Sequence, residues 1–158
     1  MTVSWTTTTS PVGELLLVAD DEGLTAINFA PFDPMTGERD DDHPALRAAV
    51  QQLAEYFAGE RSEFELPLAA KGSAFRQQVW AALREIPYGT TTTYGAIAAE
   101  LGLTGHGARA VGLANGANPL AIVVPCHRVV ASNGSLTGYA GGLDRKRQLL
   151  VLEGAALF

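Results

Sequence analysis

The sequence predicts two domains: a small α/β domain with a three-stranded antiparallel sheet and one helix, then a mainly helical domain. β-prone runs separated by turn signals fill the first thirty residues, whereas later segments repeat apolar residues at helical spacing. The charge changes sign between the two halves. Residues 1–70 carry 13 acidic residues and 3 Arg, a net charge of −10, and residues 71–158 carry 8 basic and 4 acidic residues, a net charge of +4. We therefore expect a boundary between residues 70 and 71.

The first domain begins with three predicted strands. The runs "TVSWTTTT", "ELLLVAD" and "LTAINFA" are joined by the turn sequences "SPVG" and "DDEG", a pattern typical of an antiparallel meander. The segment "PFDPMTGERDDD" is rich in Pro, Gly and Asp and is predicted to be a loop. A helix is expected from His43 to Ala58, with Pro44 in its first turn and Gly59 at its end. Its apolar face comprises Leu46, Val50, Leu53 and Phe57.

The second domain opens with helices. Ser73 can cap a helix that stops before Pro87, and Thr93 can cap a second helix over Tyr94–Leu101. The turn "LTGH" leads to a short helix in "GARAVGLANG", and this pair of helices is what a helix-turn-helix requires. The run "LAIVV" is predicted to be a buried strand that ends at Pro125, and "RVVASNGSL" an extended piece with a turn. A last helix is expected in "LDRKRQLLVLEG".

Composition excludes several classes of protein. A chain of 158 residues with 47% hydrophobic and 18% charged residues can bury a core, and none of its apolar runs approaches the ~20 residues of a membrane span. No signal peptide is visible. The single cysteine excludes an internal disulfide and fits a reducing compartment, and the three separated histidines form no metal-binding pattern. We expect a cytoplasmic protein without a membrane segment, metal or cofactor.

Cys126 lies in the stretch "IVVPCHRV", beside His127 and Arg128. A lone buried cysteine is commonly inert, because thiols pack well among aliphatic groups. It becomes a nucleophile only where a base or a cation favours the thiolate. Candidates are the two neighbours and Glu153 in the last helix, which would otherwise be a solvated helix end.

Arg109 lies among small residues in "GARAVGLANG", including Ala108 and Gly112. It could be an ordinary surface arginine in a tight helix crossing. Small side chains also let a backbone approach a polymer closely, and arginine suits contact with phosphates or stacked bases. The positive charge of residues 71–158 fits a nucleic-acid partner despite the net charge of −6 for the whole chain.

Taken together, these segments resemble the O6-alkylguanine-DNA alkyltransferases, the methylated-DNA–protein-cysteine S-methyltransferase family. The resemblance rests on "PCHR" preceded by "ARAVG" and followed by "GYAGG", and it covers residues 73–158 strongly and residues 1–72 more loosely. It implies a ribonuclease-H-like α/β domain followed by a winged helix-turn-helix domain. It also implies repair of duplex DNA by one irreversible transfer of an alkyl group from O6-alkylguanine, and from O4-alkylthymine, to the cysteine. We expect a monomer that can load cooperatively on DNA.

The resemblance also assigns roles to residues. Cys126 is expected to accept the alkyl group, His127 to deprotonate it through a water, and Glu153 to orient the histidine, while Asn118 braces the turn that carries the thiol. The other positions are expected to form the base pocket (Tyr94, Val129, Tyr139, Ala140) and to bind DNA (Arg109 as an intercalating finger, with Ala108 and Gly112).

Two details limit the resemblance, and two other functions compete with it. Some relatives have serine where Ala140 stands, which leaves the range of accepted alkyl groups open, and the zinc-site cysteines of some eukaryotic relatives are missing. A binding-only sister group has tryptophan in place of the cysteine, so Cys126 favours transfer. A Cys-His hydrolase would turn over repeatedly. A DNA-binding regulator would keep its function without the thiol.

Overall fold

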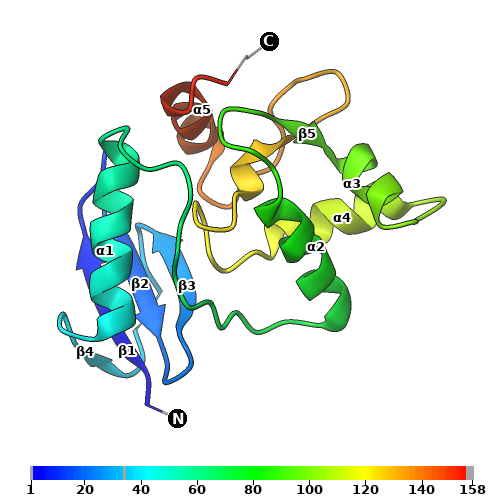
Figure 1. Ribbon diagram of the computed structural model, residues 1–158. Coiled ribbons are helices and arrows are strands. Elements are labelled where there is room, and N and C mark those ends of the chain that lie inside the picture. The colour runs from blue at the N-terminus through cyan, green and yellow to red at the C-terminus, as the bar shows by residue number, and fades with distance from the viewer. Residues whose placement is uncertain (1, 34, 156–158) are drawn as a thin grey trace. The chain divides into compact units, whose positions relative to one another are not determined.

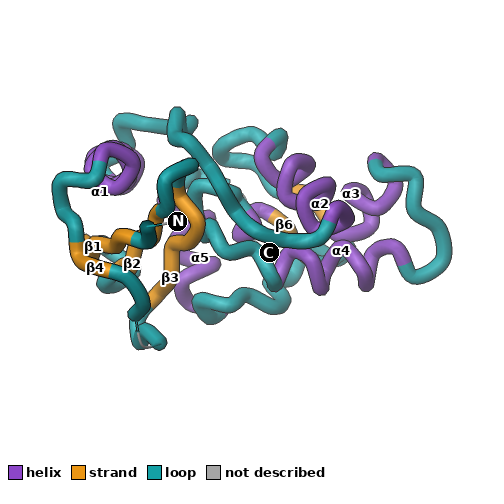
Figure 2. The backbone as a smooth tube through the Cα atoms, turned by 90° about the horizontal axis from the view of Figure 1, so that it is seen from below, coloured by secondary structure: helices purple, strands orange, loops and turns teal. Residues whose placement is uncertain are grey.

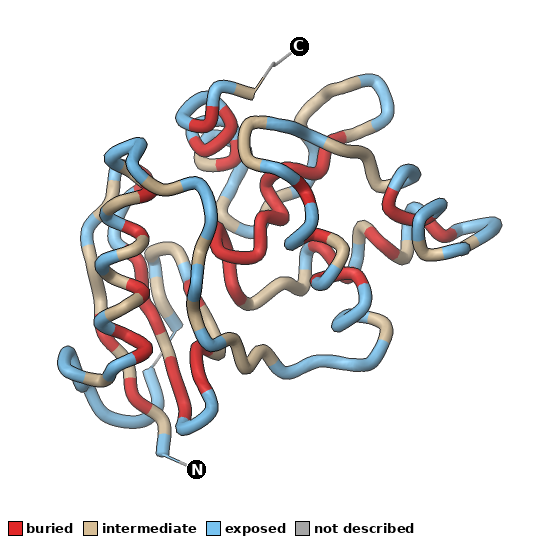
Figure 3. Tube along the Cα trace, viewed as in Figure 1, coloured by how far each residue is buried: buried red, intermediate tan, exposed pale blue. Residues whose placement is uncertain are grey.

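The computed structural model describes residues 2–33 and 35–155. The chain divides into two compact units, residues 1–71 and residues 72–158. Each unit has its own buried apolar core, as Figure 3 shows. None of the described helices is long and apolar enough to cross a membrane.

The first unit is a four-stranded mixed sheet with one helix on one face (Figures 1 and 2). The strand order is β3-β2-β1-β4, with β1 (Ser4–Thr8), β2 (Leu15–Ala19), β3 (Leu24–Phe29) and β4 (Glu38–Arg39). The three predicted strands form and pair antiparallel, with an irregular register at Val18/Ala19.

The three-stranded prediction was incomplete, because β4 adds a parallel strand beside β1 from the segment expected to be a loop. The amide of Glu38 donates to the Val3 carbonyl (3.1 Å), and that of Asp40 donates to the Trp5 carbonyl (2.9 Å). Gly37 has a φ of 83°, and a Cβ there would collide with the Val3 carbonyl. The two residues of β4, Glu38 and Arg39, are exposed and polar. They show no alternation of apolar and polar residues, so the sequence gives no sign of this strand.

Helix α1 (Pro44–Phe57) contacts β1 and β2 through its apolar face. The His43 imidazole caps it by accepting from the Ala45 amide at 3.2 Å. Of the predicted face, Leu46 and Leu53 are buried, whereas Val50 and Phe57 lie half-buried at its edges. The centre of the buried stripe is shifted toward Ala49 and Tyr56, whose ring is fully buried.

Three helices form one part of the second unit: α2 (Ala74–Arg84), α3 (Tyr94–Glu100) and α4 (Gly107–Gly116) (Figure 1). Ser73 and Thr93 cap α2 and α3 as predicted, each accepting from the amide three residues ahead. The indole of Trp80 donates to the Ala114 carbonyl (2.9 Å) and ties α2 to α4. Helix α4 begins close to α3 because Gly107 has no side chain. A Cβ there would lie 2.7 Å from the Leu103 Cβ and 3.3 Å from the Ala98 Cβ.

The run Leu120–Val124 is not the buried strand that the sequence predicts. It forms a tight turn in which the amide of Val124 donates to the Leu120 carbonyl at 2.9 Å. Ile122 has a φ of 73°, a conformation that β-branched residues rarely adopt. The run is apolar because it crosses the core of the second unit, where every residue from 120 to 130 is buried (Figure 3). Apolar content alone cannot distinguish such a turn from a strand.

After the turn, Cys126–Arg128 form a single 3-10 turn, η1, and β6 (Val129–Val130) pairs in parallel with β5 (Thr92–Thr93). Helix α5 (Leu143–Leu152) buries Lys146, Leu149 and Leu150. Its contacts with η1 bring the end of the chain against the residues around the thiol.

Candidate active site

The thiol of Cys126 lies at the start of η1 and is buried, with 6% of the residue exposed. Burial raises its pKa, because an apolar surrounding disfavours the thiolate. Hydrogen bonding from Asn118 and the positive charge of Lys146 act in the opposite direction without reversing the shift. The resting thiol is therefore protonated at neutral pH, and a reaction at sulfur requires a base.

His127 and Glu153 form a buried pair next to this thiol. The imidazole Nε2 lies 2.7 Å from Glu153 Oε2, and both side chains are fully buried. Burial lowers the pKa of His127, although Glu153 opposes the shift, so the imidazole is neutral at neutral pH. With Nε2–H donating to the carboxylate, the lone pair lies on Nδ1, which is buried and has no hydrogen-bond partner among the described residues. A neutral imidazole in this tautomer can accept a proton.

Arg128 holds the same carboxylate from the other side. Its Nε donates to Glu153 Oε1 at 2.8 Å, and its Nη2 donates to Oε2 at 3.0 Å. The remaining guanidinium nitrogen, Nη1, donates to the Ile86 carbonyl at 2.7 Å. The Gly89 amide also donates to Glu153 Oε1 at 3.4 Å. The bidentate pair fixes the carboxylate, and thereby the orientation of the imidazole.

Asn118 connects the two ends of the turn before the thiol. Its Nδ2 donates to the Val124 carbonyl (2.8 Å), and its Oδ1 accepts from the Leu120 amide (3.0 Å). The same side chain is close enough to hydrogen-bond to the Cys126 sulfur. These bonds close the turn that contains Ile122 and ends two residues before Cys126.

Most of the predicted pocket residues lie beside the thiol or on the loop before α5. Val129 is fully buried, and the Tyr139 side chain lies within hydrogen-bonding reach of Cys126. The Tyr94 hydroxyl donates to the Thr137 carbonyl at 3.4 Å and thereby joins the start of α3 to this loop. Ala140 is exposed.

The predicted DNA-contacting residues lie on α4. Arg109 and Ala108 are exposed, and no hydrogen bond or ion pair involves Arg109 among the residues that the structure describes. Gly112 lies under the Tyr94 ring, since a Cβ there would be 3.8 Å from its Cδ1. Leu113 is 73% exposed. This arrangement leaves the arginine on an open helix surface.

Sequence reasoning missed two buried polar residues, Asn115 and Lys146. It named Arg128 as a candidate cation beside the thiol, whereas the guanidinium binds Glu153. The Asn115 Nδ2 donates to the Cys126 carbonyl at 3.5 Å. Lys146 sits in "DRKRQLL", which reads as a basic surface segment. A signal was available, because Lys146 shares one helix face with Leu149 and Leu150 at i+3 and i+4.

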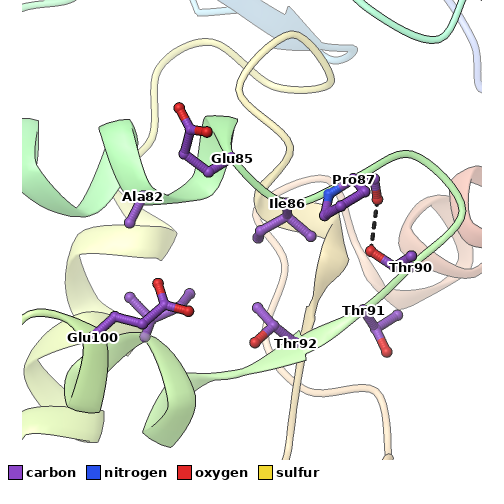
Figure 4. A pocket seen from close by; sticks show the side chains of 9 residues that line it. Ala82, Glu85, Ile86, Pro87, Thr90, Thr91, Thr92 and Glu100 are labelled. Atoms are coloured by element: carbon purple, nitrogen blue, oxygen red, sulfur yellow. Dashed lines mark hydrogen bonds between the residues drawn. The ribbon is translucent and has the colours of Figure 1, made fainter.

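A cavity of about 250 Å³ lies elsewhere in the second unit, between the end of α2, β5 and α3 (Figure 4). Its lining includes the carboxylates of Glu85 and Glu100 and a row of threonines, of which Thr90 donates to the Pro87 carbonyl. None of the predicted site residues lines it. Within the described ranges, no group of three or more His, Cys, Asp or Glu could hold a metal ion.

A buried thiol is followed in the chain by a neutral imidazole whose Nε2 bonds a carboxylate, an arrangement suited to a class of proteins that use a cysteine nucleophile with a general base. Comparison with known proteins identifies the family to which the chain belongs. Residues 3–70 match the 6-O-methylguanine DNA methyltransferase ribonuclease-like domain, and residues 74–155 match the DNA-binding domain of the same family. The chain belongs to the 6-O-methylguanine DNA methyltransferase family.

Individual relatives are similar to this chain over most of its length. A methylated-DNA–protein-cysteine methyltransferase of Mycolicibacterium paratuberculosis is 50% identical over 153 residues, which are 96% of this chain and 92% of the relative. One from Methanosarcina acetivorans is 50% identical over 154 residues, covering 92% and 95%. The crystal structure of Mycobacterium tuberculosis OGT in complex with DNA is similar with a TM-score of 0.88, at 49% identity, covering 96% of this chain and 92% of that one.

Proposed function

We propose that this protein repairs DNA by moving the alkyl group of O6-alkylguanine, and of O4-alkylthymine, onto Cys126. The observation that carries the proposal is the buried His127–Glu153 pair, with a 2.7 Å bond, next to the only cysteine of the chain. Family membership and the names of relatives at about half identity support it.

The chemistry is a single displacement at carbon. His127 Nδ1 takes the thiol proton through a water, the sulfur forms a bond to the alkyl carbon, and the bond from that carbon to O6 breaks. The electron pair leaves on guanine, which is reprotonated as the imidazolium returns its proton. The product is a thioether, which neither a neutral imidazole nor a carboxylate can hydrolyse. Each molecule therefore acts once.

The base must leave the duplex to reach a buried thiol, which costs a few kcal/mol. We infer that α3, the turn 101–106 and α4 act as the helix-turn-helix of a winged domain, with Ala108 and Gly112 allowing close approach and Arg109 filling the stack. Tyr94 would then contact the extruded base, the carbonyls of Cys126 and Val129 would accept from its amino group, and Tyr139 and the Ala140 amide would close the pocket. Residues 71–158 would form this DNA-binding domain, and residues 1–70 the ribonuclease-H-like one.

The physiological setting follows from the same assignment. We infer that the protein works in the cytoplasm on double-stranded DNA as a monomer, with cooperative loading on the duplex. A free thiol that must stay reduced until it meets damage fits a reducing compartment.

Incubation with a duplex carrying O6-methylguanine should add one methyl group, in place of a hydrogen, to the peptide that contains Cys126. The endpoint should be one methyl per chain, because the thioether has no route of release. Peptide mass spectrometry with an excess of substrate measures both, and the Cys126→Ala chain and an unmethylated duplex are the controls. Repair that continues after all chains are labelled would instead establish a hydrolase.

Binding to DNA should weaken as salt rises, through the positively charged second unit. Each phosphate neutralised by Lys or Arg releases counterions and contributes ~0.9 to the negative slope of log affinity against log salt. Fluorescence anisotropy with unrelated duplex sequences measures the slope. The exposed Arg47 of the first unit supplies the control, since Arg47→Gln should leave the slope unchanged. An affinity for DNA that does not change with salt concentration would contradict the prediction that Lys and Arg of the second unit contact phosphates.

A further inference from the structure

Lys146 is a fully buried lysine on the inward face of α5, with 0% of the residue exposed. A buried ammonium loses its hydration, which costs several kcal/mol unless other groups compensate it. Its Nζ donates to the Thr137 carbonyl at 2.7 Å, a neutral acceptor. Lysines are almost never fully buried unless they are paired, so the surroundings of this ammonium are informative.

No fixed anion supplies that partner within the described residues, where no carboxylate lies at ion-pair distance from Lys146. The contrast with Arg128 is direct, because that equally buried cation is neutralised by Glu153 at 2.8 Å. Lys146 interacts electrostatically with two titratable groups of η1: it favours the thiolate of Cys126, and it disfavours protonation of His127. The ammonium therefore faces a negative charge only when the thiolate forms.

The same lysine also holds the pocket loop. The Thr137 carbonyl accepts from Lys146 Nζ and from the Tyr94 hydroxyl, and the Thr137 hydroxyl donates to that of Tyr94 at 3.5 Å. Thr137 thus connects α5, the loop between β6 and α5, and the first residue of α3. Removing Lys146 would release both the loop and the tyrosine.

We propose that Lys146 is a positioning residue for alkyl transfer: its ammonium stabilises the Cys126 thiolate, and its bond to Thr137 fixes the loop and Tyr94 around the thiol. The assignment rests on the proposed function for the reaction, although its electrostatic half concerns the thiol alone. Lys146 itself neither gives nor takes a proton, which passes from sulfur to His127.

The ionisation of the lysine agrees with this role. Burial lowers the pKa of Lys146 to about 8, and the interaction with Cys126 opposes the shift. The ammonium is therefore present at neutral pH, when His127 draws the proton from sulfur, and it is lost above about pH 8. Its support for the thiolate should decline over that upper range.

Two substitutions separate charge from hydrogen bonding: Lys146→Met removes both, and Lys146→Gln keeps a donor toward Thr137. The thiolate is titrated directly by its ultraviolet absorbance, using the Cys126→Ser chain as the blank, and this needs no DNA. Because the ammonium is lost above about pH 8, below the raised pKa of the thiol, the difference should appear on the neutral limb of the titration. Between pH 7 and 8 we expect the thiolate signal to fall ~10-fold in both variants, since an opposite charge nearby shifts a pKa by ~1–3 units. Transfer from methylated duplex at pH 7 should slow at least ~10-fold.

The matched control is Arg147→Met, which removes an exposed positive charge one position along α5 and should leave the thiol titration unchanged. An unchanged thiolate signal at pH 7 to 8 in both Lys146 variants would overturn the electrostatic role, and a normal transfer rate in Lys146→Met would overturn the assignment. If both variants unfold by circular dichroism, NMR titration of Lys146 decides: its pKa should be higher in the parent chain than in Cys126→Ser, and equal values would refute the pairing. Failure of the parent chain to take up methyl groups would count against the proposed function. The titrations of Cys126 and Lys146 would still test the pairing, because they need no DNA.

Discussion

Replacement of Glu153 by Gln should slow alkyl transfer to Cys126 by ~10²-fold or more at pH 7, the usual range for general-base catalysis. The carboxylate contacts His127 through a 2.7 Å bond. In the proposed reaction it would stabilise the imidazolium that forms when the thiol loses its proton. Glutamine keeps the shape and loses the charge. Single-turnover kinetics with methylated duplex measures the rate, and binding to DNA should stay near normal because both side chains are buried.

The pH dependence should distinguish this relay from a general loss of structure. In the parent chain the base is neutral down to its lowered pKa, so the rate should stay nearly flat through neutral pH and fall only below pH 6.5, the ordinary value. Without a competent base, reaction depends on the thiolate already present. The rate of the Glu153→Gln chain should therefore rise ~10-fold per pH unit up to the raised pKa of the thiol. The difference in transfer rate between the parent chain and Glu153→Gln should therefore become smaller at high pH.

Stability must be measured alongside, because Glu153 also neutralises buried Arg128. Removing one partner of a buried ion pair costs ~3–5 kcal/mol, so Glu153→Gln should unfold at lower denaturant concentration. Arg128→Met is the matched control, since it breaks the same ion pair and keeps the His127–Glu153 bond. It should lose stability, and it should lose less of the transfer rate than Glu153→Gln, because the imidazole is less firmly oriented but the carboxylate charge remains. Equal rate losses in the two folded variants would make Glu153 a structural residue.

Replacement of Arg109 by Ala should slow repair of duplex DNA by ~10- to 100-fold, while reaction with free O6-benzylguanine changes little. Extruding a base costs a few kcal/mol, and ~1.4 kcal/mol corresponds to tenfold in rate. Arg109 is exposed on α4 with no hydrogen bond to other described residues, so its loss should leave the fold and the thiol intact. The ratio of the two rates is the decisive measurement.

The control for this substitution is Arg84→Ala, which removes one exposed positive charge from α2 in the same unit. It should affect duplex repair only slightly. Equal losses of Arg109→Ala on the duplex and on the free base would show that the arginine supports the fold of α4. A loss shared with Arg84→Ala would assign its effect to net charge.

Local chemistry makes most of the secondary structure readable from the sequence. Ser73 and Thr93 indicate where α2 and α3 begin, because their hydroxyls accept hydrogen bonds from backbone amides in the first turn of each helix. The strands of the meander are marked by turn sequences between β-prone runs. These signals act within a few residues, so they need no knowledge of the rest of the chain.

The predictions that were wrong depend on backbone and side-chain hydrogen bonds that the pattern of apolar residues does not encode. The strand β4 forms because a polar segment without a strand pattern pairs in parallel with the edge strand β1. The run 120–124 is a turn because the Asn118 side chain bonds both its ends. Burial makes such a run apolar whatever its backbone conformation, which is why its composition indicated a strand.

The sequence by itself determined the kind of chemistry, through a lone thiol followed by an imidazole and flanked by motifs that resemble one family. Only the tertiary structure decided how that chemistry is set up. It brings Glu153 to within 2.7 Å of a histidine 26 positions away, adds Arg128 to the same carboxylate, and buries Lys146 in the second unit. The physical reason is that pKa values and tautomers depend on desolvation and on charges a few ångströms away, and the folded chain sets these distances between residues that the sequence separates.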